Sequence, residues 1–321
     1  MLFSLTPTLF PMKLHPLPGT DLRLSTFCCG LGDLFSLPPD QSDALLDAYV
    51  EAGGNFFDTA HMYSHWLPGG NGLSEISIGD YIRRRGLTNA VVATKGGAGA
   101  LWRYRKTDDP LSPGRISADI DDSLARLEVD VISLYYLHGD DPKRTPEELI
   151  DTLHAEIKRG RLRYIAVSNW PGERIAAAND YARSKNLPPF VISSPRWSLA
   201  AHKKKPGLND AKEAVWYRAA KFPVAPYCPT AWGFFAGVPY KGEDPYDSAE
   251  NFQRRKRAQE LAKKYGVAPN EIALAWMLHQ PFPVFPILGT KNPARLKEAI
   301  TSGDIRLAPE EVQWLESGDA A

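Results

Sequence analysis

The chain has 321 residues, enough for one large domain or two ordinary ones, and 43% of them are hydrophobic, as in ordinary globular proteins. Its 38 Lys and Arg residues balance 38 Asp and Glu residues, so no net positive charge favours nucleic acid or an anionic membrane as a partner. Three cysteines, two of them adjacent, argue against a disulfide framework and favour the reducing cytoplasm, and no apolar run has the length of a membrane helix.

The amino-terminal part of the sequence predicts an extension and a hairpin. Met12-Lys13-Leu14 looks like a second beginning, so residues 1–12 are expected to precede the domain, which covers residues 13–321 as one unit. The segment Lys13–Leu24 carries a Pro-Gly-Thr-Asp turn between short apolar stretches. This pattern is typical of a β-hairpin, which we expect to plug the bottom of the barrel described next.

Strand and helix patterns then alternate to the end of the chain. Eight short apolar runs predict strands, at Thr26–Cys29, Asn55–Phe57, Val91–Thr94, Val131–Leu137, Tyr164–Val167, Phe190–Ser193, Val224–Tyr227 and Val284–Leu288. Helical patterns separate or follow them, at Asp40–Ala52, Leu73–Arg85, Ser117–Leu127, Pro146–Arg159, Gly172–Asn186, Ala211–Lys221, Ala249–Tyr265, Pro269–Gln280, Pro293–Thr301 and Glu310–Glu316. The alternation implies a parallel sheet, and eight repeats predict an α/β fold, a (β/α)8 TIM barrel with extra helices near the carboxyl terminus.

Four ionisable side chains fall where strands of such a barrel end. Asp58, Lys95 and His138 each follow or end an apolar run, and Tyr63 lies in the loop after Asp58. Parallel barrels carry their chemistry at the carboxyl ends of the strands, so these residues are expected to meet there. Each has an ordinary alternative, such as a helix cap or a core histidine. Together, an acid, a phenol, an ammonium and an imidazole are suited to moving a proton while a hydride moves elsewhere.

Two other motifs predict less. Gly30-Leu31-Gly32 is similar to the start of a dinucleotide fingerprint, but Pro38-Pro39 postpone the helix that should follow directly, which favours a loop. His61 and His65 are spaced like metal ligands on a helix. The nearby Pro68-Gly69-Gly70 argues against a helix, and no metal site is predicted.

The sequence resembles the aldo-keto reductases from about Lys13 to Glu316. The segments that carry the resemblance lie on most of the predicted strands: Gly53–Tyr63, Gly72–Glu75, Val92–Gly97, Asp130–His138, Gly160–Asn169 and Pro286–Lys291. The resemblance implies a (β/α)8 barrel with a nicotinamide cofactor lying across its carboxyl end, and no metal.

The same resemblance assigns roles to the four ionisable residues. Tyr63 is expected to act as the general acid in carbonyl reduction. Lys95 is expected to lower the phenol pKa from its ordinary value near 10, and Asp58 to keep Lys95 charged. His138 is expected to donate a hydrogen bond that orients the carbonyl oxygen, while the hydride comes from the cofactor.

The resemblance also assigns residues to the nicotinamide. Ser168 and Asn169 are expected to hold the carboxamide, with Ser194 where the family usually has a glutamine. Tyr227 is expected to stack on the nicotinamide ring. The loop that begins at Cys228 and runs to Gly237 is expected to follow the pyrophosphate.

At the adenosine end, Gly289 and Thr290 precede a helix whose amino end favours an anion. Lys291 and Arg295 add cations there, which suggests a 2′-phosphate and therefore NADPH, with NADH as the alternative. Glu298 resembles the family's contact to the adenine. Gly289 replaces a lysine that is frequent in strongly NADP-selective members.

The expected substrate is an aldehyde or ketone, with a sugar or an aryl carbonyl as candidates. Trp66, Trp102 and Trp232 lie in loops after strands and are candidate walls of the substrate pocket, with ordinary loop packing as the alternative. A binding or regulatory protein on the same fold, like the potassium-channel β-subunits, is a second hypothesis, and a metal-dependent isomerase a third. The protein is expected to be a monomer or a small homo-oligomer with no partner beyond its substrate.

Overall fold

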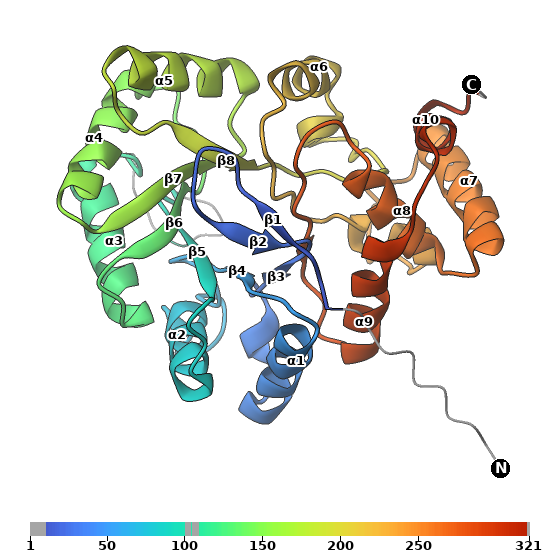
Figure 1. The fold of residues 1–321 in the computed structure, drawn as a ribbon, viewed down its shortest axis with the longest axis horizontal. Helices are drawn as coiled ribbons and strands as arrows, with labels where there is room; N and C mark the ends of the chain where they lie inside the picture. The colour runs from blue at the N-terminus through green and yellow to red at the C-terminus, as the bar shows by residue number, and fades with distance from the viewer. Residues whose placement is uncertain (1–10, 100–103, 105–108, 320–321) are drawn as a thin grey trace.

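A short antiparallel hairpin covers one end of the barrel. The computed structural model describes residues 11–99, 104 and 109–319. Strands β1 (Leu14–Pro16) and β2 (Arg23–Ser25) pair with each other and lie in front of the main sheet in Figure 1. Leu17, Leu22 and Leu24 are buried with the side chains of the barrel interior. The hairpin therefore plugs the barrel as predicted.

The described part of the expected extension packs against the domain. Met12 is buried, and its backbone N–H donates to the carbonyl of Ala52 at 2.7 Å. Residues 1–10 lie outside the described residues, so the boundary at residue 13 stays a prediction.

The main sheet is parallel and has the strand order β8-β7-β6-β5-β4-β3-β9. Its strands are β3 (Cys28–Gly30), β4 (Phe56–Asp58), β5 (Val91–Gly96), β6 (Ile132–Leu137), β7 (Leu162–Ser168), β8 (Phe190–Ser194) and β9 (Ile287–Leu288). Seven of the eight predicted apolar runs therefore contribute a strand. The predicted α/β barrel is confirmed in its order and its parallel pairing.

The predicted seventh strand, Val224–Tyr227, occupies its expected place but does not form a continuous strand. Val224 bridges Ser193 of β8 on one side and Val284 on the other, which closes the barrel. Proline lacks the backbone N–H that a sheet ladder needs. Pro226 interrupts this run and Pro223 precedes it, while Pro286 interrupts the neighbouring run Val284–Leu288 and Pro283 precedes that one. The prediction of a full strand here is wrong for this reason.

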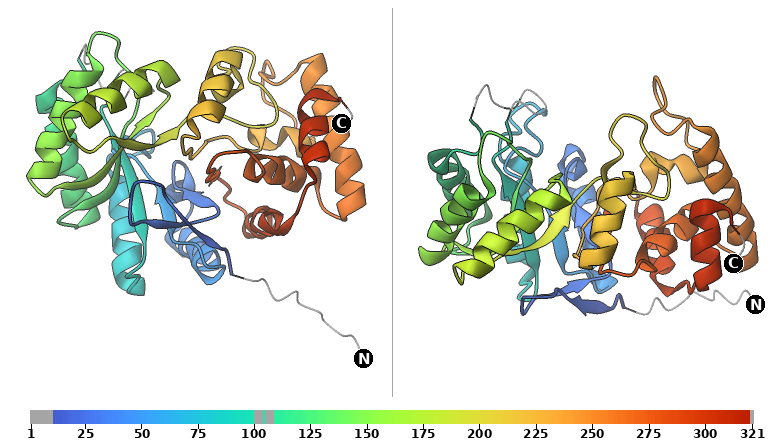
Figure 2. Two further views of the ribbon diagram at one scale, coloured as in Figure 1. Left: turned by 45° about the horizontal axis from the view of Figure 1, so that its top comes forward. Right: turned by 90° about the horizontal axis from the view of Figure 1, so that it is seen from above.

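Helices cover the outer surface of the barrel (Figures 1 and 2). The surrounding helices are α1 (Pro39–Glu51), α2 (Leu73–Arg85), α3 (Pro113–Leu127), α4 (Pro146–Lys158), α5 (Gly172–Ser184), α6 (Ala211–Ala220) and α9 (Pro293–Thr301). The predicted extra helices are α7 (Ala249–Tyr265), α8 (Pro269–Leu278) and α10 (Pro309–Ser317), and α7 contacts both α8 and α10. Helix α3 begins at Pro113 rather than at the predicted Ser117, because proline suits the first turn of a helix. No helix in the described part of the chain is long and apolar enough to cross a membrane.

Two layers of apolar side chains position the strand ends. One lies inside the barrel and includes Phe56, Leu134 and Tyr136, and the other lies between the sheet and its helices and includes Phe57 and Tyr135. Neighbouring residues of a strand point to opposite faces, so both faces of each strand are buried. Buried on both faces, the strands present their carboxyl ends at the side away from the hairpin.

Candidate active site

The structure brings the four predicted catalytic residues together at the carboxyl ends of the strands. Asp58 ends β4, Lys95 lies near the end of β5, and His138 follows directly after β6. Tyr63 comes from the turn after β4. Its ring centroid lies 5.7 Å from that of His138, with an interplanar angle of 75°.

Lys95 occupies the centre of this group. Its Nζ donates to Asp58 Oδ2 at 2.7 Å, to the Thr59 carbonyl at 2.7 Å and to the Tyr63 hydroxyl at 3.2 Å. An ammonium has three protons, and all three are used. Burial alone lowers the pKa of Lys95, but Asp58 and Tyr63 outweigh it, so the pKa is raised and the residue stays charged.

Burial raises the pKa of Tyr63 to about 12, although Lys95 lowers it in part. The expected effect of Lys95 is therefore present, but the predicted net lowering is wrong because desolvation of the phenolate is the larger effect. Tyr63 stays protonated over the physiological range. A protonated phenol beside an ammonium can donate a proton and have the resulting phenolate stabilised.

His138 is held as a neutral imidazole. Burial, reinforced by the charge of Lys95, lowers its pKa to about 3. Its backbone N–H donates to the Gly96 carbonyl at 2.8 Å, which fixes the residue at the end of β6. Nδ1 is buried without a hydrogen-bond partner among the described residues. A neutral ring has one N–H to donate, as the predicted role of orienting a carbonyl oxygen requires.

Buried polar contacts behind the tetrad fix the end of β5. Glu75 is fully buried and accepts from the Thr94 hydroxyl at 2.6 Å and from Arg126 at 3.1 Å. The adjacent Gly97 donates its backbone N–H to Asp119 at 2.9 Å. Thr94 and Gly97 flank Lys95 closely, so this network holds the backbone that carries the central ammonium. The sequence placed Glu75 in a family motif without giving it a task.

His61, one of the two histidines spaced like metal ligands, is buried, and its ring is hydrogen-bonded to other side chains. Its Nε2 lies 2.9 Å from Asp122, and its Nδ1 lies 2.5 Å from the hydroxyl of Tyr104. Both ring nitrogens are thus engaged by protein groups. Within residues 11–99, 104 and 109–319, no cluster of His, Cys, Asp and Glu has the arrangement of a metal site.

Residues predicted to bind the nicotinamide also meet at this end. The Ser168 hydroxyl donates to the Ser194 carbonyl at 2.9 Å, and Asn169 Nδ2 donates to Ser168 at 3.1 Å. The Tyr227 hydroxyl donates to Asn169 Oδ1 at 2.9 Å. Asn169 and Cys228 have φ values of +58° and +57°, conformations that are uncommon for residues other than glycine and that cluster at functional sites.

These residues fit a flat ring that carries an amide. The ring of Tyr227 is partly exposed and is held at its hydroxyl, while Asn169 is exposed. Two buried nitrogens at this end, His138 Nδ1 and Arg196 Nε, have no hydrogen-bond partner among the described residues. Buried polar atoms of this kind are usually satisfied by a ligand or water.

At the predicted adenosine end, the charged residues are exposed rather than buried. Lys291 donates to Asp33 at 2.6 Å and to the Ser36 hydroxyl at 3.1 Å, so its charge is already paired. The amino end of α9 is capped by the side chain of Asn292. Gly289, Arg295 and Glu298 are exposed at the surface, and Thr290 accepts a hydrogen bond from the Asn292 N–H at 3.1 Å.

Two of the predicted substrate-wall residues border the site, and Trp102 lies outside the described residues. Trp66 is 45% exposed, with its ring centroid 6.4 Å from that of Tyr63. Trp232 is 46% exposed and stacks on Tyr240 at 5.2 Å. Sequence reasoning did not single out His65 beside these residues, although its ring lies 5.3 Å from that of Trp66.

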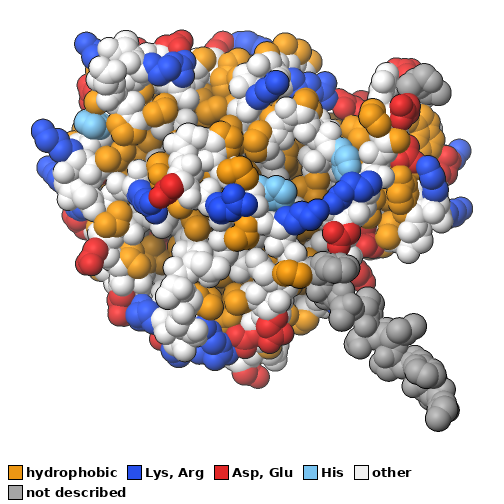
Figure 3. Space-filling model, in the orientation of Figure 1, with side chains coloured by type: hydrophobic (Ala, Val, Ile, Leu, Met, Phe, Trp, Pro, Cys, Tyr) orange, Lys and Arg blue, Asp and Glu red, His pale blue; other side chains and the backbone are white. Residues whose placement is uncertain are grey.

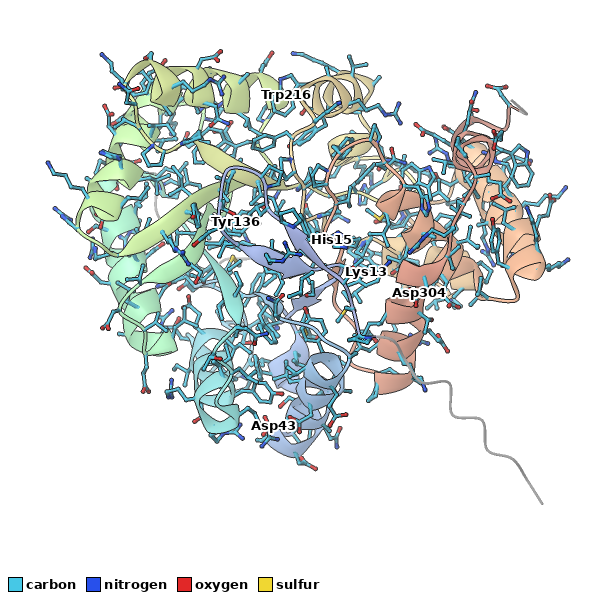
Figure 4. All side chains as sticks on the ribbon, viewed as in Figure 1. Lys13, His15, Asp43, Tyr136, Trp216 and Asp304 are labelled. Carbon is cyan, nitrogen blue, oxygen red and sulfur yellow. The ribbon has the colours of Figure 1, made fainter. Side chains whose placement is uncertain are left out.

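A cavity of about 540 Å³ opens at the opposite end of the barrel, beside the hairpin. Lys13, His15 and Asp304 line it (Figure 4), together with apolar residues of α8 and the segment before β9. Lys, Arg and His side chains are visible across this face in Figure 3. The cavity is separated from the tetrad by the packed barrel interior, so we place the active site at the tetrad.

A parallel barrel with an Asp, Tyr, Lys and His tetrad at the carboxyl ends of its strands defines an oxidoreductase architecture. The chain belongs to the aldo/keto reductase family, whose model matches residues 27–319. The fold, the order of the motifs and the tetrad geometry all agree with this assignment.

The chain is also similar to two curated relatives, and it shares its fold with a solved structure. The chain is 29% identical over 343 aligned residues to a norsolorinic acid reductase of Emericella nidulans, covering 94% of this chain and 80% of the relative. It is 29% identical to a probable aryl-alcohol dehydrogenase of Saccharomyces cerevisiae, covering 88% of each. A thermostable aldo-keto reductase solved with the inhibitor epalrestat has the same fold, with a TM-score of 0.74, 20% identity and coverage of 95% of this chain and 99% of that one.

Proposed function

We propose that the protein reduces an aldehyde or ketone to the alcohol with NADPH as the hydride donor. The observation that carries this proposal is the tetrad, in which the Lys95 ammonium lies 2.7 Å from Asp58 and 3.2 Å from the Tyr63 hydroxyl. This arrangement supplies a protonated phenol, a nearby fixed cation and a neutral imidazole at one point. Those are the groups that proton transfer to a carbonyl oxygen requires.

Each residue then has a defined part in the reaction. NADPH, when bound, supplies the hydride that reaches the carbonyl carbon. His138 donates its N–H to the carbonyl oxygen and orients it, and Tyr63 transfers its hydroxyl proton to that oxygen as negative charge develops. Lys95 stabilises the phenolate that remains, and Asp58 keeps Lys95 charged and in place. A proton from solvent restores Tyr63 for the next cycle.

The proposed cofactor contacts follow the same end of the barrel. Ser168 and Asn169 would hold the carboxamide, with Ser194 supplying the backbone carbonyl that fixes Ser168. Tyr227 would stack on the nicotinamide ring, and the loop from Cys228 would follow the pyrophosphate. Beyond it, Thr290, Lys291 and Arg295 would contact the 2′-phosphate of NADPH, and Glu298 would contact the adenine. The cations among these residues are the reason for proposing NADPH over NADH.

We infer that the substrate is an aryl carbonyl rather than a sugar. A row of aromatic rings begins at the proposed acid: Trp66 lies beside Tyr63, and His65 contacts both Trp66 and Tyr104, with ring centroids 5.3 and 5.0 Å away. Flat side chains of this kind favour a flat apolar substrate. The names of the relatives, a norsolorinic acid reductase and an aryl-alcohol dehydrogenase, support the same class.

Steady-state assays with NADPH or NADH and a panel of aryl aldehydes, aryl ketones and keto-sugars test this proposal. Tyr63→Phe removes the acid and is expected to lower turnover by about a hundredfold or more while leaving NADPH affinity within a small factor. Tyr181→Phe on the outer helix α5 is the matched control, because its hydroxyl donates to Asp151 on α4, away from the tetrad. Normal turnover by Tyr63→Phe would show that the acid is another group.

The same assay distinguishes the regulatory alternative. A protein that binds NADPH tightly but turns over no carbonyl would favour a binding role of the channel β-subunit kind. Loss of activity with a chelator would favour the metal-dependent isomerase. The three cysteines are free, which supports a reducing compartment such as the cytoplasm, and the oligomeric state stays a prediction.

A further inference from the structure

One guanidinium beside the proposed nicotinamide position has no carboxylate partner. Arg196 follows β8 and is the bridge partner of Tyr227. Its guanidinium carbon lies 4.9 Å from the ring centroid of Tyr227 and 5.3 Å from that of Trp232. The side chain is thus held between an interior ring and a loop ring, each in cation–π geometry.

The charge of Arg196 is not compensated by the described residues. It forms no ion pair within this part of the chain. Its guanidinium donates to the Tyr246 hydroxyl at 3.3 Å and also contacts the side chains of Tyr227 and Cys228, none of which is a carboxylate. Its Nε is buried without a partner. The neighbouring phenols and thiol stay protonated and therefore neutral, because burial raises the pKa of Tyr227, of the Cys228 thiol and, to about 12, of Tyr246. Arginine keeps its proton at all ordinary pH values, so the local charge is positive.

The other charges near the tetrad cancel. Lys95 is paired with Asp58 at 2.7 Å, and Arg174 is paired with Asp140 at 2.8 Å. His138 is neutral at physiological pH because its pKa is lowered to about 3 by burial and the charge of Lys95. Arg196 is therefore the uncompensated cation that the described residues place against the ring of Tyr227. The ring cannot turn away freely, because its hydroxyl is bonded to Asn169 at 2.9 Å.

We propose that Arg196 makes the site prefer the reduced nicotinamide over the oxidised one. This inference rests on the proposed function, because it takes Tyr227 as the residue on which the nicotinamide stacks. The two forms of the cofactor share their phosphates and differ at the nicotinamide, which is neutral when reduced and carries a positive charge when oxidised. A fixed cation next to Tyr227 repels the positively charged ring and leaves the neutral ring unaffected.

The ratio of two dissociation constants isolates this effect. Attraction between Arg196 and the cofactor phosphates acts on both forms and cancels in Kd for NADP+ divided by Kd for NADPH. Repulsion of the oxidised ring does not cancel. The consequence for turnover is that the oxidised product leaves more readily, so product inhibition of carbonyl reduction is weak.

The test measures both dissociation constants by equilibrium titration for the wild-type protein, Arg196→Met, Arg196→Gln and Arg196→Lys. The Kd ratio is expected to fall about three- to tenfold in Arg196→Met and Arg196→Gln, because the charge is lost, and to change less than about twofold in Arg196→Lys, because the charge is kept. Arg295→Met is the matched control, since the same change at the proposed adenosine end alters both constants together.

The possible outcomes distinguish failure of the role proposed for Arg196 from failure of the proposed function. If Kd rose by the same factor for NADP+ and NADPH, so that their ratio stayed unchanged, Arg196 would act by binding the cofactor phosphates, and the proposal would be overturned. An unchanged ratio with unchanged constants would also overturn it. Failure of the wild-type protein to bind either form would instead overturn the proposed function. If Arg196→Met fails to fold because Trp232 and Tyr246 lose a contact, Arg196→Gln keeps a hydrogen-bond donor and gives the same comparison, with circular dichroism to confirm folding.

Discussion

The two ends of the proposed cofactor site hold their charged groups in different ways. At the tetrad, Lys95 and Asp58 are buried and all three ammonium protons have partners. At the adenosine end, Lys291 and Asp33 form an exposed pair, and Arg295 and Glu298 are exposed. A buried pair is expensive to disturb, whereas an exposed pair contributes little and exchanges partners readily. The tetrad is therefore held in one geometry, whereas substitutions at the adenosine end are expected to change the preference between NADPH and NADH at little cost in stability.

The largest expected effect comes from breaking the buried pair. Lys95→Met leaves Asp58 buried without its partner, which is expected to cost about 3–5 kcal/mol of the free energy of unfolding and to lower turnover by about a hundredfold to a thousandfold. Urea unfolding and steady-state rates measure the two effects. The double variant Lys95→Met with Asp58→Asn removes both charges and should recover much of the stability but none of the activity. Full stability in the single variant would mean that the pair is not buried as described.

The next effect is the pH dependence of the free energy of unfolding, which arises from the buried tetrad residues His138 and Tyr63. The pKa of His138 is lowered to about 3, below its unfolded value of 6.5, so its contribution to stability is complete above pH 6.5 and is lost as pH falls toward 3. Each pH unit in that window removes up to about 1.4 kcal/mol. The pKa of Tyr63 is raised to about 12, so its contribution is complete below pH 10 and is lost as pH rises from 10 to 12.

Two measurements check this pH dependence. Unfolding titrations of the wild-type protein and of His138→Gln between pH 4 and 8 should show a steeper acid loss in the wild-type protein, since its neutral imidazole must gain a proton on unfolding. The rate of carbonyl reduction should stay level from about pH 7 to pH 9, because Tyr63 keeps its proton and His138 stays neutral over that range. Equal acid sensitivity of both proteins would contradict the assigned state of His138.

The smallest expected effect lies at the adenosine end. Asp33→Asn releases Lys291 from its exposed ion pair, and the freed ammonium is expected to tighten NADPH binding about two- to fivefold without a matching change for NADH. Titration of both cofactors measures this. Asp21→Asn is the matched control, because Asp21 pairs with Arg163 at the hairpin end of the barrel. If NADPH binding weakened instead, Asp33 would be positioning Lys291 rather than competing for it.

The contrast between the two ends also explains which predictions the sequence supported. Asp58, Lys95 and His138 could be placed because each follows or ends an apolar strand, and strand ends of a parallel barrel converge whatever the loops do. Lys291 could be named but its partner could not, since Asp33 lies far away in the sequence and meets it only across the folded surface. Arg196 had no sequence signal, because nothing local distinguishes an unpaired arginine from a paired one.

Two predictions, the lowered pKa of Tyr63 and the full strand at Val224–Tyr227, were wrong because both depended on the tertiary surroundings. The net pKa of Tyr63 depends on how deeply the phenol is buried, which motif spacing does not contain. The run Val224–Tyr227 has strand-like composition, yet its prolines and those of the neighbouring segment remove the N–H groups that a ladder needs. The sequence contained those prolines, and their effect depended on which segments became neighbours.

The sequence by itself determined the order of strands and helices, the hairpin, the family and the identity of the tetrad, because these depend on periodicity and on residues at strand ends. Only the tertiary structure decided which charges are paired, which are buried and which stay uncompensated. Coulomb energy and desolvation depend on distance and burial in three dimensions, and neighbours along the chain seldom fix either. That is why Lys95, Lys291 and Arg196, three cations of the proposed site, have three different electrostatic environments.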